Sequence, residues 1–298
     1  MFAPLHPASL DPPASMNLQI VVALLMLLAA AMHAGWNLFV KADGDKLAAL
    51  TALTVIGAAL CAAALPFVTP PERASWPFIL LSILAHIGYY ACLVGAYRHG
   101  DLSLVYPIAR GAAPLLVAIA AAPIAGEWLS GVQSLGVALI SLGIASLAFE
   151  RGSPLGRHGR PVLWALGTAL FITAYSVVDG LGVRRAGSAA GYILWLFALE
   201  AIPLGLYTLA VRRAALIGYV ARAWKRALAG ALLSCGAYGL AIWAMSVATL
   251  AGVVSLRETS VLFGAAFGAL FLGERFGSRR IGAAVAVVAG NLLLQLAG

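Results

Sequence analysis

The sequence predicts an all-α, polytopic membrane protein whose ten transmembrane helices form two inverted five-helix repeats. Composition is the first observation behind this fold class. Hydrophobic residues make up 62% of the 298 residues, charged residues make up only 10%, and the mean hydropathy is +0.97. A soluble domain usually carries about 25% charged residues. So little polar composition excludes a soluble protein, and we expect a multi-pass protein of the inner (plasma) membrane.

Long apolar runs are the second observation. A helix needs about 20 mostly apolar residues to cross the hydrocarbon layer. The runs are continuously apolar and do not alternate as the strands of a membrane barrel do, so helices are favoured over strands. The predicted spans are, in order, 18–40, 47–69, 77–97, 103–125, 130–149, 162–182, 188–211, 227–247, 251–272 and 278–297.

An internal repeat is the third observation. Residues 110–127 and 257–274 align without a gap at a separation of 147 residues, and six of the eighteen positions are identical. Arg110 aligns with Arg257, and the Gly-Glu pair that closes the first segment aligns with the pair that closes the second. A further apolar run follows each segment. Duplicated hydrophobic units are common in secondary transporters, with the substrate site between the copies.

The gaps between the predicted spans define the boundaries of the repeats. Residues 18–149 form a first repeat of five helices and 162–298 a second, and the linker 150–161 joins them. Because each copy has an odd number of spans, the second copy enters the membrane from the opposite side. Residues 1–17 contain no Lys or Arg and therefore lack the basic region of a signal peptide. They are either a disordered tail or a mis-assigned start, with Met16 as the alternative first residue.

The net charge of +8 does not indicate nucleic acid, since the basic residues occupy the short gaps between apolar runs, as membrane anchors do. The basic gap 212–226 predicts a short surface helix. Glu127 and Glu274 end their spans and are predicted at the surface, where they cap a helix or pair with a cation. We expect packing roles for the cysteines and for Gly264 and Gly268, which form a GxxxG motif. No cofactor or metal is expected, and the chain is either a monomer or a homodimer.

Three segments together resemble the EamA-type branch of the drug/metabolite transporter superfamily. They are HAGWNLFVK at 33–41 and the paired endings GEWLSGVQSLGVALISLGI and GERFGSRRIGAAVAVVAGN. The first ending departs from the second, because Trp128 stands where the second has Arg275. The resemblance implies ten helices, inverted repeats, and a central cavity through which small metabolites move under ion or solute gradients. Because such proteins handle amino acids, nucleotide sugars, sugar phosphates and other compounds, it does not fix a substrate.

Ionisable side chains inside spans are costly and usually face a cavity or a partner. Arg110 lies inside the fourth span between Pro107 and Pro114, and Tyr106 shares its helix face. Arg257 is its counterpart in the second copy. An arginine presents a fork of donors that suits carboxylate or phosphate. We therefore predict substrate contact for these arginines and for Tyr106, with internal ion pairs as the alternative.

Further polar residues share helix faces in other spans. Trp36 and Asn37 accompany a polar stripe in the first span, and Tyr175 lies four residues before Asp179 in the sixth. We predict that Trp36, Asn37 and Tyr175 line the cavity. Glu200 stands alone at mid-span, and burial disfavours the charged form of a carboxyl group. Glu200, Asp179 and His86 are therefore candidates for proton coupling, with structural hydrogen bonding as the alternative.

The predicted function is secondary transport of a small polar metabolite, either an amino acid or an anionic organic compound, by alternating access between the repeats. An enzyme is not expected, because neither an HExxH motif nor a GxSG-type nucleophile is present. Two alternatives remain open: a membrane-embedded enzyme, and an assembly subunit that transports nothing. The predicted partners are the solute, a coupled proton or second solute, and the lipid bilayer.

Overall fold

The computed structural model describes residues 16–99, 102–149, 159–272 and 278–296, and within these ranges it contains helices and no strand. Short 3-10 turns follow α2, precede α3 and follow α5. The α-helices are α1 (Met16–Lys41), α2 (Lys46–Ala64), α3 (Trp76–His99), α4 (Leu102–Ala125), α5 (Gly131–Ser146), α6 (Gly159–Val183), α7 (Ala189–Val247), α8 (Leu250–Arg257), α9 (Ser260–Leu272) and α10 (Ser278–Leu296).

The surface of the helix bundle is apolar. Within the described ranges, seven segments are long and apolar enough to cross a membrane, and α5 and the main part of α10 are shorter apolar helices. Large side chains such as Leu24, Leu84 and Leu142 are 61%, 62% and 70% exposed. Soluble proteins rarely expose apolar patches on this scale. The all-helical fold and the membrane class predicted from the sequence are therefore supported together.

Two elements differ from the predicted spans. One long helix, α7, includes the runs 188–211 and 227–247 together with the gap between them, and it is kinked at Arg212 (φ −141°, ψ 38°) and at Ala223 (φ −128°, ψ 22°). The run 251–272 is instead divided into α8 and α9, with a break at Glu258 and Thr259. Apolar composition alone reveals neither change, because kinks and breaks depend on the packing around them.

Helix starts and turns follow local sequence signals. Asp45, Ser130 and Ser188 cap α2, α5 and α7 by accepting a hydrogen bond from a backbone N–H three residues later. Gly126 and Gly187 follow α4 and α6 with φ of 72° and 65°. Glycine adopts this left-handed conformation without the steric cost that a side chain brings. Gly126 and Gly187 therefore allow the chain to turn back after α4 and after α6.

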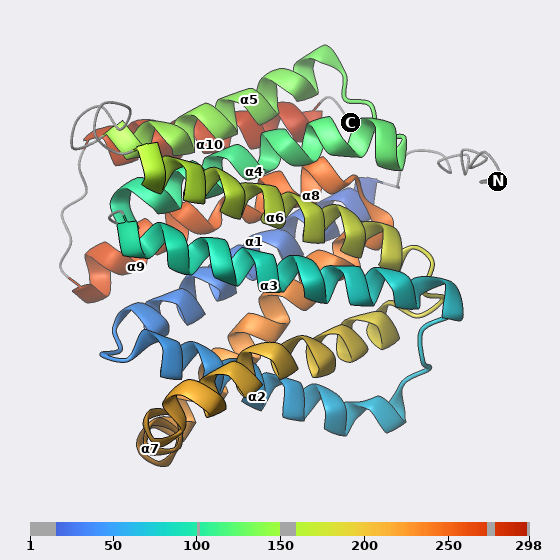
Figure 1. The fold of residues 1–298 in the computed structure, drawn as a ribbon. Coiled ribbons are helices and arrows are strands. Elements are labelled where there is room, and N and C mark those ends of the chain that lie inside the picture. The colour runs from blue at the N-terminus through green and yellow to red at the C-terminus, as the bar shows by residue number, and fades with distance from the viewer. Residues whose placement is uncertain (1–15, 100–101, 150–158, 273–277, 297–298) are drawn as a thin grey trace.

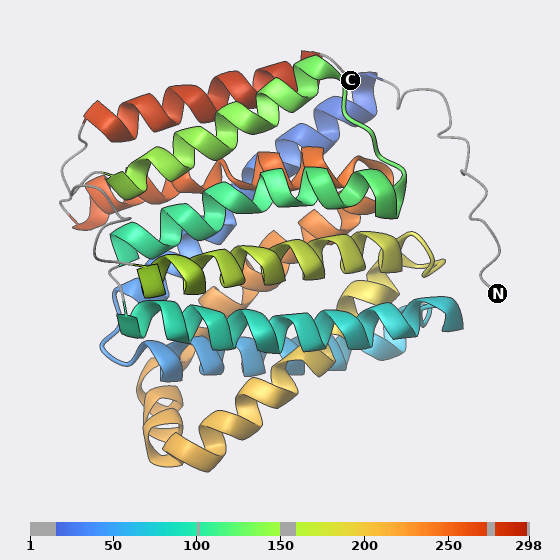
Figure 2. The same ribbon diagram turned by 45° about the horizontal axis from the view of Figure 1, so that its top comes forward.

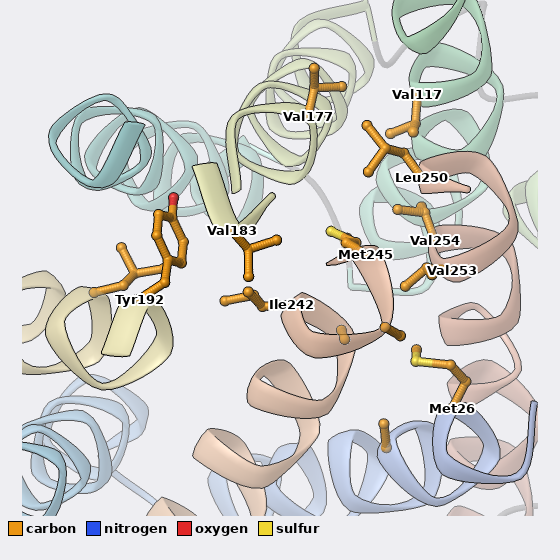
Figure 3. Close-up of a cluster of buried hydrophobic side chains, with 14 of the residues drawn as sticks. Met26, Val117, Val177, Val183, Tyr192, Ile242, Met245, Leu250, Val253 and Val254 are labelled. Carbon is orange, nitrogen blue, oxygen red and sulfur yellow. The ribbon is translucent and has the colours of Figure 1, made fainter. Parts of the chain in front are cut away.

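The principal apolar core lies where α1, α4, α6, α7 and α8 meet. Figure 3 shows Met26 of α1 and Leu250 and Val254 of α8 near Ile242 and Met245 of α7. All five of these side chains are fully buried. The core therefore joins helices from both predicted repeats.

Close backbone contacts depend on particular glycines. A Cβ added at Gly136 of α5 would lie 2.6 Å from the carbonyl oxygen of Gly290 in α10. No atom lies within 4 Å of a Cβ added at Gly264, which is exposed. Among the described residues, Gly264 therefore makes no close contact and does not have the packing role predicted for it, whereas α5 and α10 do pack through small residues.

The connections between helices gather at two ends of the molecule. Figures 1 and 2 show the α2–α3, α4–α5 and α6–α7 connections at one end, beside the start of α1 and the end of α10. The α1–α2 turn and the kinked middle of α7 lie at the opposite end. The arginines predicted to contact substrate lie between these two ends.

Candidate functional site

Arg110 and Arg257 meet at a buried carboxylate. Arg110 projects from α4, Arg257 is the last residue of α8, and Glu258 follows it in the break before α9. The Nε of Arg110 lies 2.9 Å from Oε2 of Glu258, and their side chains are 6% and 0% exposed. The atoms are close enough for a strong Coulomb attraction, although the N–H does not point along a hydrogen-bond direction. A charge pair therefore joins the two predicted repeats in the interior.

The rest of Arg110 is held by neighbouring polar groups. Its Nη2 donates a hydrogen bond to Oγ of Ser260, the first residue of α9, at 3.1 Å. Tyr106 lies one helical turn before Arg110, on the same face of α4. We call Tyr106, Arg110, Arg257, Glu258 and Ser260 the arginine cluster.

Arg257 has nitrogen atoms without protein partners. Its Nε and Nη2 are buried and make no hydrogen bond with any described residue. Its guanidinium lies 5.9 Å from the ring centre of Tyr175 and 5.6 Å from that of Tyr238. Ring faces attract a cation but do not satisfy its N–H groups. The cluster holds two arginines and one glutamate, so its formal charge is +1, and it presents unused donors.

A second group of titratable residues adjoins the same rings. Asp179 of α6 accepts hydrogen bonds from Tyr238 and, at 3.0 Å, from Tyr192. The ring of His86 stacks on Tyr175 at 4.2 Å between centres. Nε2 of His86 lies 4.0 Å from Oε1 of Glu200. The three residues predicted for coupling thus lie together, and we call His86, Asp179 and Glu200 the acid cluster.

One carboxylate oxygen of the acid cluster is buried and makes no hydrogen bond of normal geometry to the described residues. The Nδ1 of His86 lies 2.9 Å from the carbonyl oxygen of Ser82, so His86 donates its Nδ1–H to that carbonyl. The other ring nitrogen, Nε2, then faces Glu200 without a proton when the imidazole is neutral. Oε2 of Glu200 is buried without a hydrogen bond to any described group. Within the described ranges, no three His, Cys, Asp or Glu residues are grouped to hold a metal ion. The arrangement suits proton binding and release between neighbouring side chains.

The remaining predicted residues, Trp36 and Asn37, lie on α1 and contact His33 of the same helix. Trp36 meets the ring of His33 edge-on at 5.1 Å, and the Asn37 amide donates to the carbonyl oxygen of His33 at 2.8 Å. His33 itself lies in the electrostatic field of Arg110 and Arg257. Among the described contacts, no hydrogen bond or ion pair joins Trp36 or Asn37 to an arginine. In α1, His33 is therefore the residue most closely associated with the arginine cluster.

Sequence reasoning missed several members of the site. Tyr192 and Tyr238 lie in different segments of α7, and nothing in their local sequence distinguishes them from other aromatic residues in spans. Ser260 was missed because the break before α9 was not expected. Glu258 adjoins Arg257 in sequence, yet its close partner is Arg110, 148 positions away. Only the packing of α4 against α8 brings this pair together.

The predicted surface position of Glu127 is wrong, although its predicted capping and pairing roles are confirmed. Its side chain is 6% exposed, and Oε1 accepts a 2.6 Å hydrogen bond from Nη2 of Arg184. Its Oε2 accepts from the backbone N–H of Leu250 at 2.7 Å, at the start of α8. A carboxylate at a helix N-terminus is stabilised by unpaired N–H groups there, which explains its burial. Glu274 and Gly268 lie outside the residues whose side chains are described.

Comparison with known proteins supports the fold and no more. No family model and no curated protein matches the sequence. A solved structure described as "Crystal structure of protein" superposes with a TM-score of 0.74 over 95% of this chain and 98% of that one, at 18% sequence identity. The chain is therefore similar to a known fold along nearly its whole length.

Proposed function

We propose that the chain is a secondary transporter of small metabolites that carry a carboxylate or phosphate group, acting by alternating access in the inner membrane. The observation that carries the proposal is Arg257, a buried arginine with two hydrogen-bond donors that no described group accepts. Burying unpaired polar groups is costly, and buried guanidinium groups pair readily with oxyanions. Amino acids and anionic organic compounds both supply such a partner.

The proposed architecture is ten transmembrane helices in two inverted repeats. The two outer segments of α7 each count as one span, and α8 with α9 counts as one broken span. Under this numbering several helix contacts have a counterpart in the other copy. The contacts of α4 with α6 and of α1 with α9 are equivalent, and α5 packs on its own counterpart α10. Such a pattern favours transporters in which one repeat moves against the other.

The break between α8 and α9 supports binding at the arginine cluster. Discontinuous membrane helices in transporters place freed backbone groups and helix ends beside the substrate. Here the break falls between Arg257 and Ser260, and its residues are buried. Arg110 and Arg257 are 5% and 3% exposed, so both side chains are almost completely covered by the protein. A solute enters only after a change in the packing between the repeats.

The acid cluster is the proposed coupling site. Tyr175 and Tyr238 contact Arg257 on one side and His86 on the other. A proton bound at His86, Asp179 or Glu200 therefore changes the charge next to the proposed anion site. Uptake of a negative solute together with a proton needs such proximity.

The test is transport by purified protein in liposomes. A thermal-shift screen of amino acids, organic acids, phosphonates and sugar phosphates selects ligands, because binding stabilises the folded state. Counterflow of a radiolabelled hit into preloaded vesicles supports transport, and acceleration by an imposed pH gradient supports coupling. Chemical conversion without accumulation favours a membrane-embedded enzyme. Neither binding nor flux for any anionic compound overturns the proposal and favours an assembly subunit.

A further inference from the structure

The middle segment of α7, residues 212–226, is set apart from the spanning helices. Kinks at Arg212 and Ala223 mark its ends. In Figure 1 it is viewed nearly down its axis, at the lower left, while α2 and α3 run across the page. Figure 2, turned by 45°, shows it running across the direction of those helices. The segment therefore lies transverse to the bundle, at the end that also holds the α1–α2 turn.

One side of this segment is fixed to the protein. Leu216 and Tyr219 are buried against the start of α2. The Tyr219 hydroxyl donates to Oδ2 of Asp43 at 2.8 Å, and Arg212 and Arg226 form ion pairs with Asp45 and Asp43 at 3.2 Å and 3.3 Å. These contacts hold the segment beside the α1–α2 turn and use the two acidic residues of that turn.

The rest of the segment's surface carries exposed apolar and basic residues. Ile217 and Trp224 are 54% and 50% exposed, and Val220 between them is also exposed. Arg213, Arg222 and Lys225 are exposed too, and no ion pair joins them to an acid among the described residues. The segment contains no acidic residue. A helix that pairs an apolar face with basic side chains lies in the membrane interface and is attracted to anionic lipids.

We propose that residues 213–225 form a docking surface for anionic phospholipid headgroups. Ile217, Val220 and Trp224 enter the boundary between headgroups and acyl chains, while Arg213, Arg222 and Lys225 contact lipid phosphates. The charge complementarity selects an anionic lipid over a neutral one, and the exposed apolar side chains select a bilayer over a soluble acidic protein. Lipid bound here braces the kinked segment that connects the two outer parts of α7.

The test compares two charge-matched variants of the full-length protein in detergent micelles. The first carries Arg213→Gln, Arg222→Gln and Lys225→Gln. The control carries Arg73→Gln, Arg98→Gln and Arg160→Gln, which neutralise three exposed basic residues elsewhere. Binding of phosphatidylglycerol and phosphatidylcholine is measured by native mass spectrometry. A basic residue near an anionic surface strengthens binding about fivefold, so the first variant is expected to lose about 100-fold in phosphatidylglycerol affinity.

The control variant is expected to bind phosphatidylglycerol like the unmodified protein. A variant with Arg213→Lys and Arg222→Lys keeps the charge and is also expected to bind normally. Soluble glycerol phosphate is not expected to compete, because it lacks the acyl chains that Ile217 and Trp224 would contact. Equal losses in both triple variants would indicate attraction to overall charge and overturn the proposal, as would an unchanged affinity in the first. Melting temperatures without lipid show that each variant is folded.

Discussion

Arg110 and Arg257 hold equivalent places in the repeat but differ in their surroundings. Arg110 forms a close ion pair with Glu258 and donates to the hydroxyl of Ser260, while the guanidinium of Arg257 lies beside the rings of Tyr175 and Tyr238 and makes no ion pair within 4 Å among the described residues. Removing one partner of a buried ion pair leaves the other charge uncompensated, whereas removing an arginine without an acid partner does not. Substitutions at the two arginines therefore distinguish an effect on stability from an effect on transport.

Arg257→Gln is expected to reduce transport by at least about tenfold without loss of folded protein. A hydrogen bond to a charged group contributes about 1.5–3 kcal/mol, which corresponds to a factor of about 10–100 in affinity. Counterflow in liposomes as a function of solute concentration measures the change, and the exposed Arg160→Gln is the control. Unchanged solute affinity in Arg257→Gln would show that this guanidinium does not contact the solute.

Arg110→Ala is expected to abolish transport and to lower the melting temperature, because Glu258 then lies buried without its close cation. Breaking a buried pair costs about 3–5 kcal/mol. Arg110→Lys is expected to restore part of the stability but little of the transport, since lysine lacks the planar fork of donors. Melting in detergent and flux in liposomes are measured together. Transport by Arg110→Ala at the unmodified rate would contradict the assignment.

Among the elements, α5 and α10 make the closest backbone approach, through Gly136 and Gly290. Gly136→Ala is expected to destabilise the protein by about 1–3 kcal/mol, because a methyl group would overlap a backbone carbonyl that cannot rotate away. Gly264→Ala is the matched control in α9, where no atom lies within 4 Å of the added carbon. Its expected effect is zero or slightly stabilising, since alanine favours helix. Equal melting temperatures for the two variants would contradict this packing.

The elements also show how far the sequence predicts the structure. Apolar runs of about 20 residues locate the helices, and an ionisable residue within a run identifies Arg110, Asp179 and Glu200 as interior. The break at Glu258 and the burial of Glu127 were not predictable in this way. Both depend on partners far along the chain, Arg110 for Glu258 and Arg184 for Glu127. A periodic pattern gives the faces of one helix but not which face meets which neighbour.

At the scale of the whole molecule, basic residues are distributed unevenly between the two ends. Arg73, Arg184 and Arg185 lie at the end where α1 starts and α10 ends. The other 14 of the 17 Lys and Arg outside the central pair follow predicted spans one, three, five, seven and nine. Five of them belong to the segment 212–226. Among the described residues, segment 212–226 therefore places five basic residues at the end of the molecule that carries the proposed lipid surface.

This asymmetry predicts that both termini lie outside the cytoplasm. Short loops rich in Lys and Arg stay on the cytoplasmic side, and anionic lipid there attracts basic segments. Similar EamA-type transporters are usually drawn with both termini inside, so the charge distribution and the resemblance disagree. We favour the charges, because the gaps are short and neither terminal segment carries a Lys or Arg. Alkaline phosphatase fused after Gly298 is expected to be active, since it requires the periplasm, whereas fluorescence of a fused protein that matures only in the cytoplasm would reverse the orientation.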